Sequence, residues 1–86
     1  MLFLVTVRVN VARMAEFGQK LERGELDRSA MRHTYCLEKD PAVGMGVWEA
    51  ADETELEGRL GPWRPYYETV DVQPLITPAE ARTLLS

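Results

Sequence analysis

The chain has 86 residues, and its fourteen Asp and Glu outnumber ten Lys and Arg, so a net charge of −4 without any basic run argues against a nucleic-acid partner. One small domain, 1–86, accounts for this length, and its limited core is expected to be completed by a second copy of the chain. Cys36 is the only cysteine and His33 the only histidine, which excludes an internal disulfide and argues against a metal site.

The first segment, residues 2–11, alternates with period two and predicts a strand. One face is apolar and is expected to lie under helices: Phe3, Val5, Val7, Val9 and Val11. The other face is mixed and is expected to line a cavity: Leu2, Leu4, Thr6, Arg8 and Asn10. The segment is too short and too polar to span a membrane and lacks the features of a signal peptide, so a cytoplasmic protein is expected.

Residues 12–29 carry helical periodicity, with Met14, Phe17 and Leu21 on one face. Gly24 interrupts this pattern and is expected to bend the helix or end it early. Two strands are predicted next, over 31–39 and 42–50, joined by a turn at Asp40-Pro41. In the first of these strands, four side chains are expected to lie on the same face: Met31, His33, Tyr35 and Leu37.

Gly44 and Gly46 share a face with Trp48 in the strand predicted over 42–50. Glycines two apart on one face leave an empty strip where a ring or a ligand can lie close to the backbone. The Asp52-x-x-Glu55 spacing then predicts a helix start, and this helix is expected to end at Gly61 before Pro62.

Residues 67–75 predict a last strand, with Val70 and Val72 on one face and Tyr67, Thr69 and Asp71 on the other. "TPAE" at 77–80 predicts a short C-terminal helix. The order β-α-β-β-α-β is that of a ferredoxin-like α+β fold with a four-stranded antiparallel sheet. Helices are expected on one sheet face, and face-to-face dimerisation is expected to cover the other.

The stretch "GPWRPYY", residues 61–67, is the richest in chemistry. Its two prolines are expected to hold the backbone extended. Trp63, Tyr66 and Tyr67 offer flat apolar surface with polar tips, and Arg64 offers a fork for a carboxylate, which suits an organic anion with a ring. The alternative is that these rings plug the end of the core or pack on a partner subunit.

His33 is the candidate base for proton abstraction, because imidazole titrates near neutral pH. Its alternative is a hydrogen-bonded histidine packed on a strand. Arg32 must point to the opposite face unless a bulge intervenes. Cys36 is expected to be a small buried hydrophobe. Four acids are considered as proton carriers: Glu16, Glu22, Glu25 and Glu38. The alternative for each is an ordinary surface carboxylate exposed to solvent.

Three stretches carry a family resemblance: "MLFLV" at the start, the Arg32-His33 pair, and the Pro62-x-x-Pro65-Tyr66 element. Together they resemble muconolactone isomerase and its relatives, in patches over residues 1–75. The resemblance implies a ferredoxin-like subunit of a dimeric α+β barrel and cofactor-independent proton transfer on a carboxylated lactone. It also implies that Arg32, His33 and the segment 62–66 line or close the pocket, with an acid of the first helix carrying the proton.

The chain departs from this family at several positions. The connection before Arg32 is shorter by about one helical turn. Met31 stands in place of the family's tryptophan, the residues after His33 do not match, and Arg64 occupies a position that is usually apolar. These departures favour a shared scaffold with a different substrate.

The first hypothesis is therefore a cofactor-independent isomerase or cyclase of a small lactone-, enone- or polyketide-like metabolite, working as a homodimer or larger assembly without cofactor or metal. The second is a cofactor-free oxygenase or tailoring enzyme of the same barrel type. The third is a non-catalytic small-molecule binder or regulator. The candidate catalytic residues are His33 and Glu22. The candidate substrate-binding residues are Arg8, Arg32, Tyr35, Trp48, Trp63, Arg64, Tyr66 and Tyr67.

Overall fold

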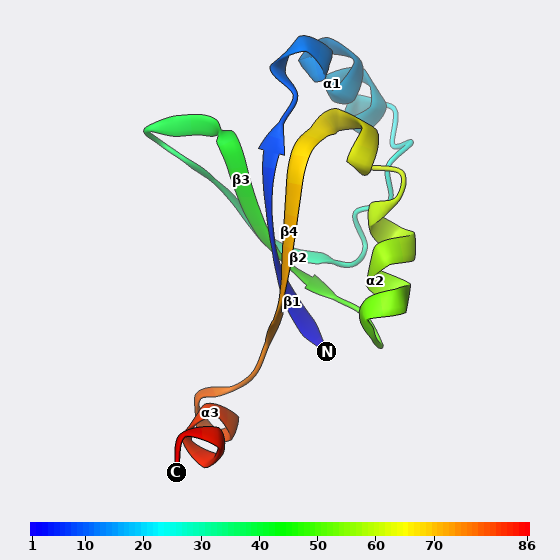
Figure 1. Cartoon of the computed structure of the whole chain (residues 1–86). Helices are drawn as coiled ribbons and strands as arrows, with labels where there is room; N and C mark the ends of the chain where they lie inside the picture. Colours follow the sequence, from blue (N-terminus) through cyan, green and yellow to red (C-terminus); the bar gives the residue numbers. More distant parts are fainter.

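The computed structural model describes residues 1–86, in which four strands form one antiparallel sheet in the order β2-β3-β1-β4 (Figure 1). The strands and helices follow the predicted β-α-β-β-α-β order with a C-terminal helix: β1 (Leu2–Val9), α1 (Met14–Glu22), β2 (Met31–Leu37), β3 (Asp40–Glu49), α2 (Glu53–Leu60), β4 (Tyr67–Leu75) and α3 (Pro78–Leu85). Two short 3-10 turns, η1 (Val11–Arg13) and η2 (Arg64–Tyr66), lie between them. The ferredoxin-like prediction is confirmed.

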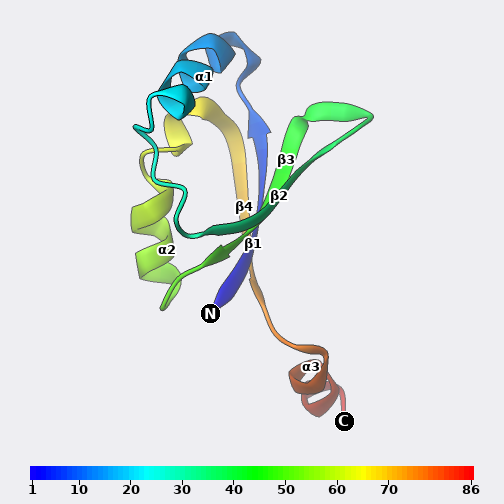
Figure 2. The same cartoon turned by 180° about the vertical axis from the view of Figure 1, so that it is seen from behind.

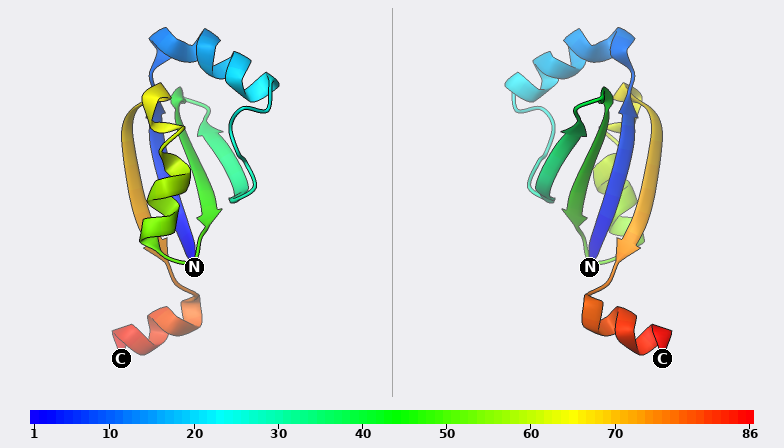
Figure 3. Two further views of the ribbon diagram at one scale, coloured as in Figure 1. Left: turned by 90° about the vertical axis from the view of Figure 1, so that its right-hand side faces the viewer. Right: turned by 90° about the vertical axis from the view of Figure 1, so that its left-hand side faces the viewer.

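The apolar face of β1 packs under the helices, as its alternation predicts. Phe3 and Val5 are almost fully buried, and Leu56 and Leu60 of α2 have no exposed surface. Figure 3 (left) shows α2 lying over β1 and β4, with α1 across one end of the sheet. No helix lies on the opposite face in Figure 3 (right), which we call the open face.

Helix α1 ends at Glu22, seven residues before the predicted limit of 29. Gly24 adopts a left-handed φ of 67°, which glycine tolerates best. Its N–H donates to the carbonyl of Leu21, and the N–H of Glu25 donates to that of Lys20. These two hydrogen bonds form a Schellman motif, which terminates the helix.

The turn between β2 and β3 also differs from the prediction. Leu37 pairs with Asp40, so the turn consists of Glu38 and Lys39, and β3 begins at Asp40. Asp40 and Pro41 lie in the strand, and the register shifts next to this turn, since Cys36 already pairs with Gly44.

Two of the three register shifts in the sheet change the face on which predicted site residues lie. Met31 pairs with Trp48 and His33 with Val47, so Arg32 is an extra residue in β2. A bulge of this kind shifts the alternation by one position. Met31 therefore lies on the helix-covered face, whereas His33 lies on the open face, and the prediction that they share a side is wrong.

The second bulge lies in β4. Arg8 pairs with Thr69 and Val9 with Tyr67, which leaves Glu68 as the extra residue. Tyr67 therefore shares the helix-covered face with Val9, and the prediction that it lies with Thr69 and Asp71 is wrong. Its ring meets the edge of Phe17 from α1 at a centroid distance of 5.8 Å.

Segment 61–67 is a compact turn, so the predicted extended backbone is wrong. Gly61 and Trp63 have helical dihedral angles, and the N–H of Trp63 donates to the carbonyl of Leu60. The fixed φ of proline is compatible with the first turn of a helix, and Pro65 occupies that place in η2.

Helix α3 stands apart from the rest of the molecule in both Figure 1 and Figure 2. Thr77 and Glu80 form the predicted capping box at its start. The helix buries none of its residues, and Leu84 and Leu85 are largely exposed. None of the helices has the length and apolar character needed to cross a membrane.

Candidate functional site

A cavity of about 300 Å³ lies against the helix-covered face of the sheet. Val5, Val7 and Val9 of β1 contribute to it from the sheet, and Phe17 and Leu21 of α1 contribute from the helical layer. The cavity therefore lies on the apolar face of β1, and the prediction that the mixed face lines it is wrong. Its lining is mainly apolar, as is usual for small-molecule sites.

Glycines in β3 leave room beside the strand at this site. A Cβ atom at Gly44 would lie 3.6 Å from both Cys36 Sγ and Val7 Cγ2. A Cβ atom at Gly46 would approach the His33 carbonyl oxygen at 3.1 Å and Thr34 Cγ2 at 3.2 Å. Both glycines line the cavity, so the empty strip inferred from their spacing lies at the site.

Aromatic rings form one end of the cavity. Trp48 of β3 and Trp63 meet edge to face with ring centroids 5.7 Å apart, and Phe17 meets Trp63 in the same way at 5.9 Å. Trp63 is only 2% exposed. It therefore belongs to the core and lines the cavity at the same time, so both alternatives for the aromatic segment hold for this ring.

Polar groups are few in the cavity. Its polar or ionisable side chains are those of Arg28, Thr34, Tyr35, Cys36 and Tyr67, and its lining includes no carboxylate and no histidine. Burial raises the pKa of Tyr67 to about 12, and the nearby Cys36 adds to this effect. At neutral pH Tyr67 is therefore a neutral phenol that can donate a hydrogen bond.

Cys36 faces the cavity from β2. It pairs with Gly44, and its sulfur lies beside the space over that glycine. The residue is exposed, so the prediction of a small buried hydrophobe is wrong. The β2–β3 edge of the sheet leaves it uncovered because α2 lies over the other two strands (Figure 3, left).

Four of the predicted substrate-binding residues line this cavity: Tyr35, Trp48, Trp63 and Tyr67. Tyr35 contributes little of its ring, because it pairs with Met45 on the open face and is 69% exposed. The other predicted site residues do not line the cavity.

The two predicted catalytic residues lie away from it. His33 is exposed and lies on the open face. It pairs with Val47, which in turn pairs with Leu4, and residues paired across strands share a face. Glu22 is the exposed last residue of α1. The structure does not bring these two side chains together with the aromatic rings.

The predicted arginines are held elsewhere by ion pairs. Arg8 contacts Asp40 at 2.9 Å and Arg32 contacts Glu49 at 2.6 Å, while Arg64 pairs with Glu57. Tyr66 is buried and stacks on Phe17 at 5.1 Å, and the Arg13 guanidinium lies over its ring at 4.8 Å from the ring centre. It serves the core rather than the cavity lining.

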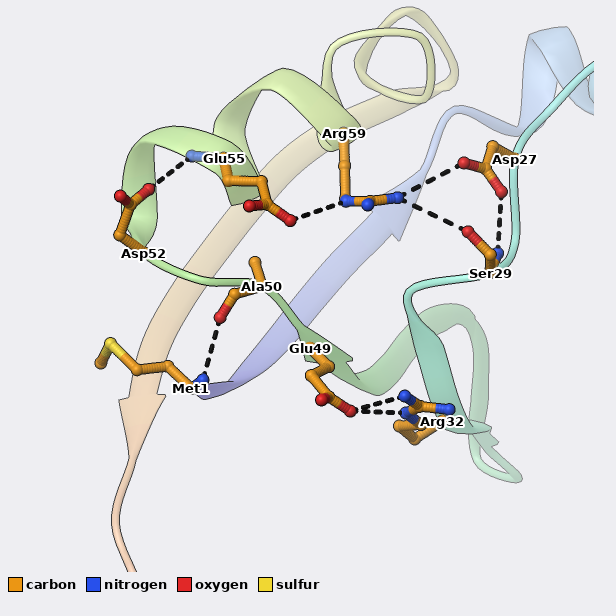
Figure 4. A network of polar contacts seen from close by, with 9 residues as sticks. All are labelled: Met1, Asp27, Ser29, Arg32, Glu49, Ala50, Asp52, Glu55 and Arg59. Atoms are coloured by element: carbon orange, nitrogen blue, oxygen red, sulfur yellow. Dashed lines mark hydrogen bonds and ion pairs between the residues drawn. The ribbon is translucent and has the colours of Figure 1, made fainter.

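Sequence reasoning missed Arg28. This residue lies in the connection from α1 to β2, which the sequence analysis assigned to a helix. Figure 4 shows how this connection is tied to α2: Arg59 contacts Asp27 at 3.4 Å and the Ser29 hydroxyl at 3.5 Å. Hydrogen bonds from Ser29, with the charge of Arg59, lower the pKa of Asp27. No periodic pattern could have indicated an arginine at the cavity.

No protein-family model matches this sequence, and no curated protein matches it. Among solved structures, the chain is similar to 5-chloro-2-hydroxyhydroquinone dehydrochlorinase (TftG) from Burkholderia phenoliruptrix AC1100, in complex with 2,5-dihydroxybenzoquinone. The TM-score is 0.65 over 93% of this chain and 98% of that chain, at 14% sequence identity. At this identity the similarity shows a shared fold.

Proposed function

We propose that this protein is a cofactor-independent enzyme that transfers a proton on a small cyclic metabolite bound in the cavity, in the class of isomerases and cyclases. The observation that carries the proposal is the aromatic-walled cavity, in which Trp48 and Trp63 together form one end of a space with few polar groups. A planar ring fits such a space through apolar and aromatic contacts. The shared fold with TftG, whose ligand is a benzoquinone, supports a cyclic substrate.

The side chains at the cavity suggest the division of roles. Tyr67 keeps its proton at neutral pH and would donate a hydrogen bond to a carbonyl or enolate oxygen of the substrate. Cys36 also lines the cavity and can exchange a proton, and it would carry the proton between two carbons of the ring system.

A second candidate is a non-catalytic small-molecule binder. The observation in its favour is that the cavity lining includes neither a carboxylate nor a histidine, the most frequent general bases. In this case the cavity would hold the ligand through its rings, and Cys36 would not be needed.

Isotope exchange separates the two candidates. Lactones, enones and phenols would be incubated with the protein in heavy water, and deuterium incorporation would be followed by NMR. The enzyme proposal predicts exchange at carbon that is lost in Cys36→Ser and kept in the matched variant Gly58→Ala, whose site in α2 is remote from the cavity. Binding without any exchange would support the binder and contradict the enzyme.

We further propose that the protein is a homodimer formed through the open face of the sheet. Leu4, Met45 and Val47 place apolar side chains on this face, and Tyr35 is exposed beside them. Side chains of this kind in the middle of an uncovered sheet are typical of a subunit interface. Helix α3, which has no packing partner within the chain, would gain one in such an assembly.

A further inference from the structure

Arg28 is the only cationic residue that lines the cavity, and no anionic residue lines it. The cavity therefore carries a positive charge within a protein whose net charge is −4. Arg28 is exposed, which places it where the cavity meets solvent. A charge at the entrance of an apolar site favours a ligand of opposite sign.

The guanidinium of Arg28 is also without a partner. Five other arginines are held by carboxylates in ion pairs: Arg8, Arg13, Arg32, Arg59 and Arg64. The side chain of Arg28 makes no hydrogen bond and no ion pair, although acids outnumber bases in this chain. Its five N–H donors are thus free to bind a carboxylate or a phenolate.

The backbone that presents Arg28 is held on both sides. The N–H of Ser29 donates to the Asp27 carboxylate at 2.9 Å, and Arg59 of α2 contacts both residues (Figure 4). The carbonyl of Arg28 itself accepts from the N–H of Met31 at 3.1 Å. A fixed backbone reduces the entropy lost when the side chain binds a ligand.

We propose that the cavity is selective for aromatic anions and that Arg28 is the residue that selects the charge. This inference rests on the proposed function, because it assigns a substrate class to the same cavity. The ring of the ligand lies against Trp48 and Trp63, its anionic group binds Arg28, and Tyr67 donates to a second oxygen. Arg64, which the sequence suggested for the anion, is already paired with Glu57.

The test compares two ligands of nearly equal shape, 1-naphthoate and neutral 1-naphthamide, by quenching of tryptophan fluorescence. In wild type we expect naphthoate to bind about tenfold more tightly than naphthamide, because its carboxylate forms an ion pair with the guanidinium and the neutral amide does not. Arg28→Met should remove this preference, and the affinity for naphthoate should fall far more than the affinity for naphthamide. Arg28→Lys should keep part of it, since the charge remains without the planar fork.

The matched control is Arg23→Met, which removes another arginine without an ion pair from the same connection but outside the cavity lining. It should leave both affinities unchanged. Equal binding of the two ligands to wild type, or an unaltered preference in Arg28→Met, overturns the inference and leaves the proposed cavity function intact. Failure of both ligands to bind overturns the two proposals together.

Discussion

Trp48 and Trp63 meet edge to face, with an angle of 83° between their ring planes. One ring comes from β3 and the other from the turn after α2, so this contact joins the sheet to the segment 61–67. The same pair forms the aromatic end of the cavity. The core and the cavity lining therefore share these side chains.

Replacement of Trp63 tests this double role. Trp63→Ala should lower the free energy of unfolding by about 3–5 kcal/mol, because a large buried side chain is lost. Trp63→Phe retains a ring and should lose far less stability, while weakening the binding of 1-naphthoate. Urea denaturation and fluorescence from Trp48 would measure the two effects. A stable Trp63→Ala protein would contradict the packing described here.

Two glycines should respond to alanine in opposite directions. Gly58 lies inside α2, and a Cβ atom there would meet no atom within 4 Å, so Gly58→Ala should stabilise the fold by about 1 kcal/mol. Gly24→Ala should destabilise it by about 1 kcal/mol, because φ is 67° at the end of α1. Thermal unfolding would rank the variants, and a gain in stability for Gly24→Ala would be incompatible with the Schellman motif.

The pKa of Tyr67 predicts how stability depends on alkaline pH. The phenol is held neutral in the folded state, where burial raises its pKa to about 12, and it ionises near pH 10 when unfolded. Its contribution to stability is fully present below about pH 10. It is lost as the pH rises through the folded value, since the unfolded state then binds fewer protons.

Urea titrations between about pH 9 and 12 on wild type and Tyr67→Phe would measure this contribution. All other titrating groups are common to both proteins. The difference between the two plots of unfolding free energy against pH therefore measures the contribution of Tyr67. We expect wild type to lose more stability over this range. Parallel curves would mean that the phenol is not held neutral by burial.

Cys36 gives a direct probe of the cavity because it is the only thiol. Labelling with N-ethylmaleimide should slow in the presence of 1-naphthoate, as an occupied cavity shields the sulfur beside Gly44. The control moves the thiol to α3, as Ser86→Cys in a Cys36→Ser background, where the ligand should have no effect. Mass spectrometry would follow both rates, and identical protection at the two positions would argue against a site at the cavity.

The proposed dimer is tested on the open face. Leu4→Arg places a charge among the apolar side chains of β1 and β3 and should shift the protein to monomer in sedimentation at micromolar concentration. Gln19→Arg adds the same charge on the exposed surface of α1 and should leave the assembly unchanged. A wild-type monomer at these concentrations would contradict the dimer outright.

Local signals predicted much of this fold. The period-two pattern of β1 places Phe3 and Val5 in the core, and Asp52 caps α2 by accepting from the N–H of Glu55. These features depend on neighbours in the sequence, so a single sequence contains them. Thr77 at the start of α3 is another such case.

The site was less predictable because it depends on distant contacts. The bulge at Arg32 moves His33 to the open face, and ladder pairing with β3, not local preference, creates that bulge. Arg28 lies in a connection that Arg59, far along the chain, contacts through Asp27. Alternation indicates faces reliably only while the ladder is regular.

The extra residue in β4 also affects how this chain should be compared with others. Without Glu68, Tyr67 would meet Val9 in unbroken register and keep its phenol at the cavity. A protein shorter by one residue at this position can therefore keep Tyr67 on the same face of the sheet. An alignment gap at position 68 is therefore compatible with a tyrosine that faces the cavity, and a one-codon deletion there restores a regular ladder between β1 and β4.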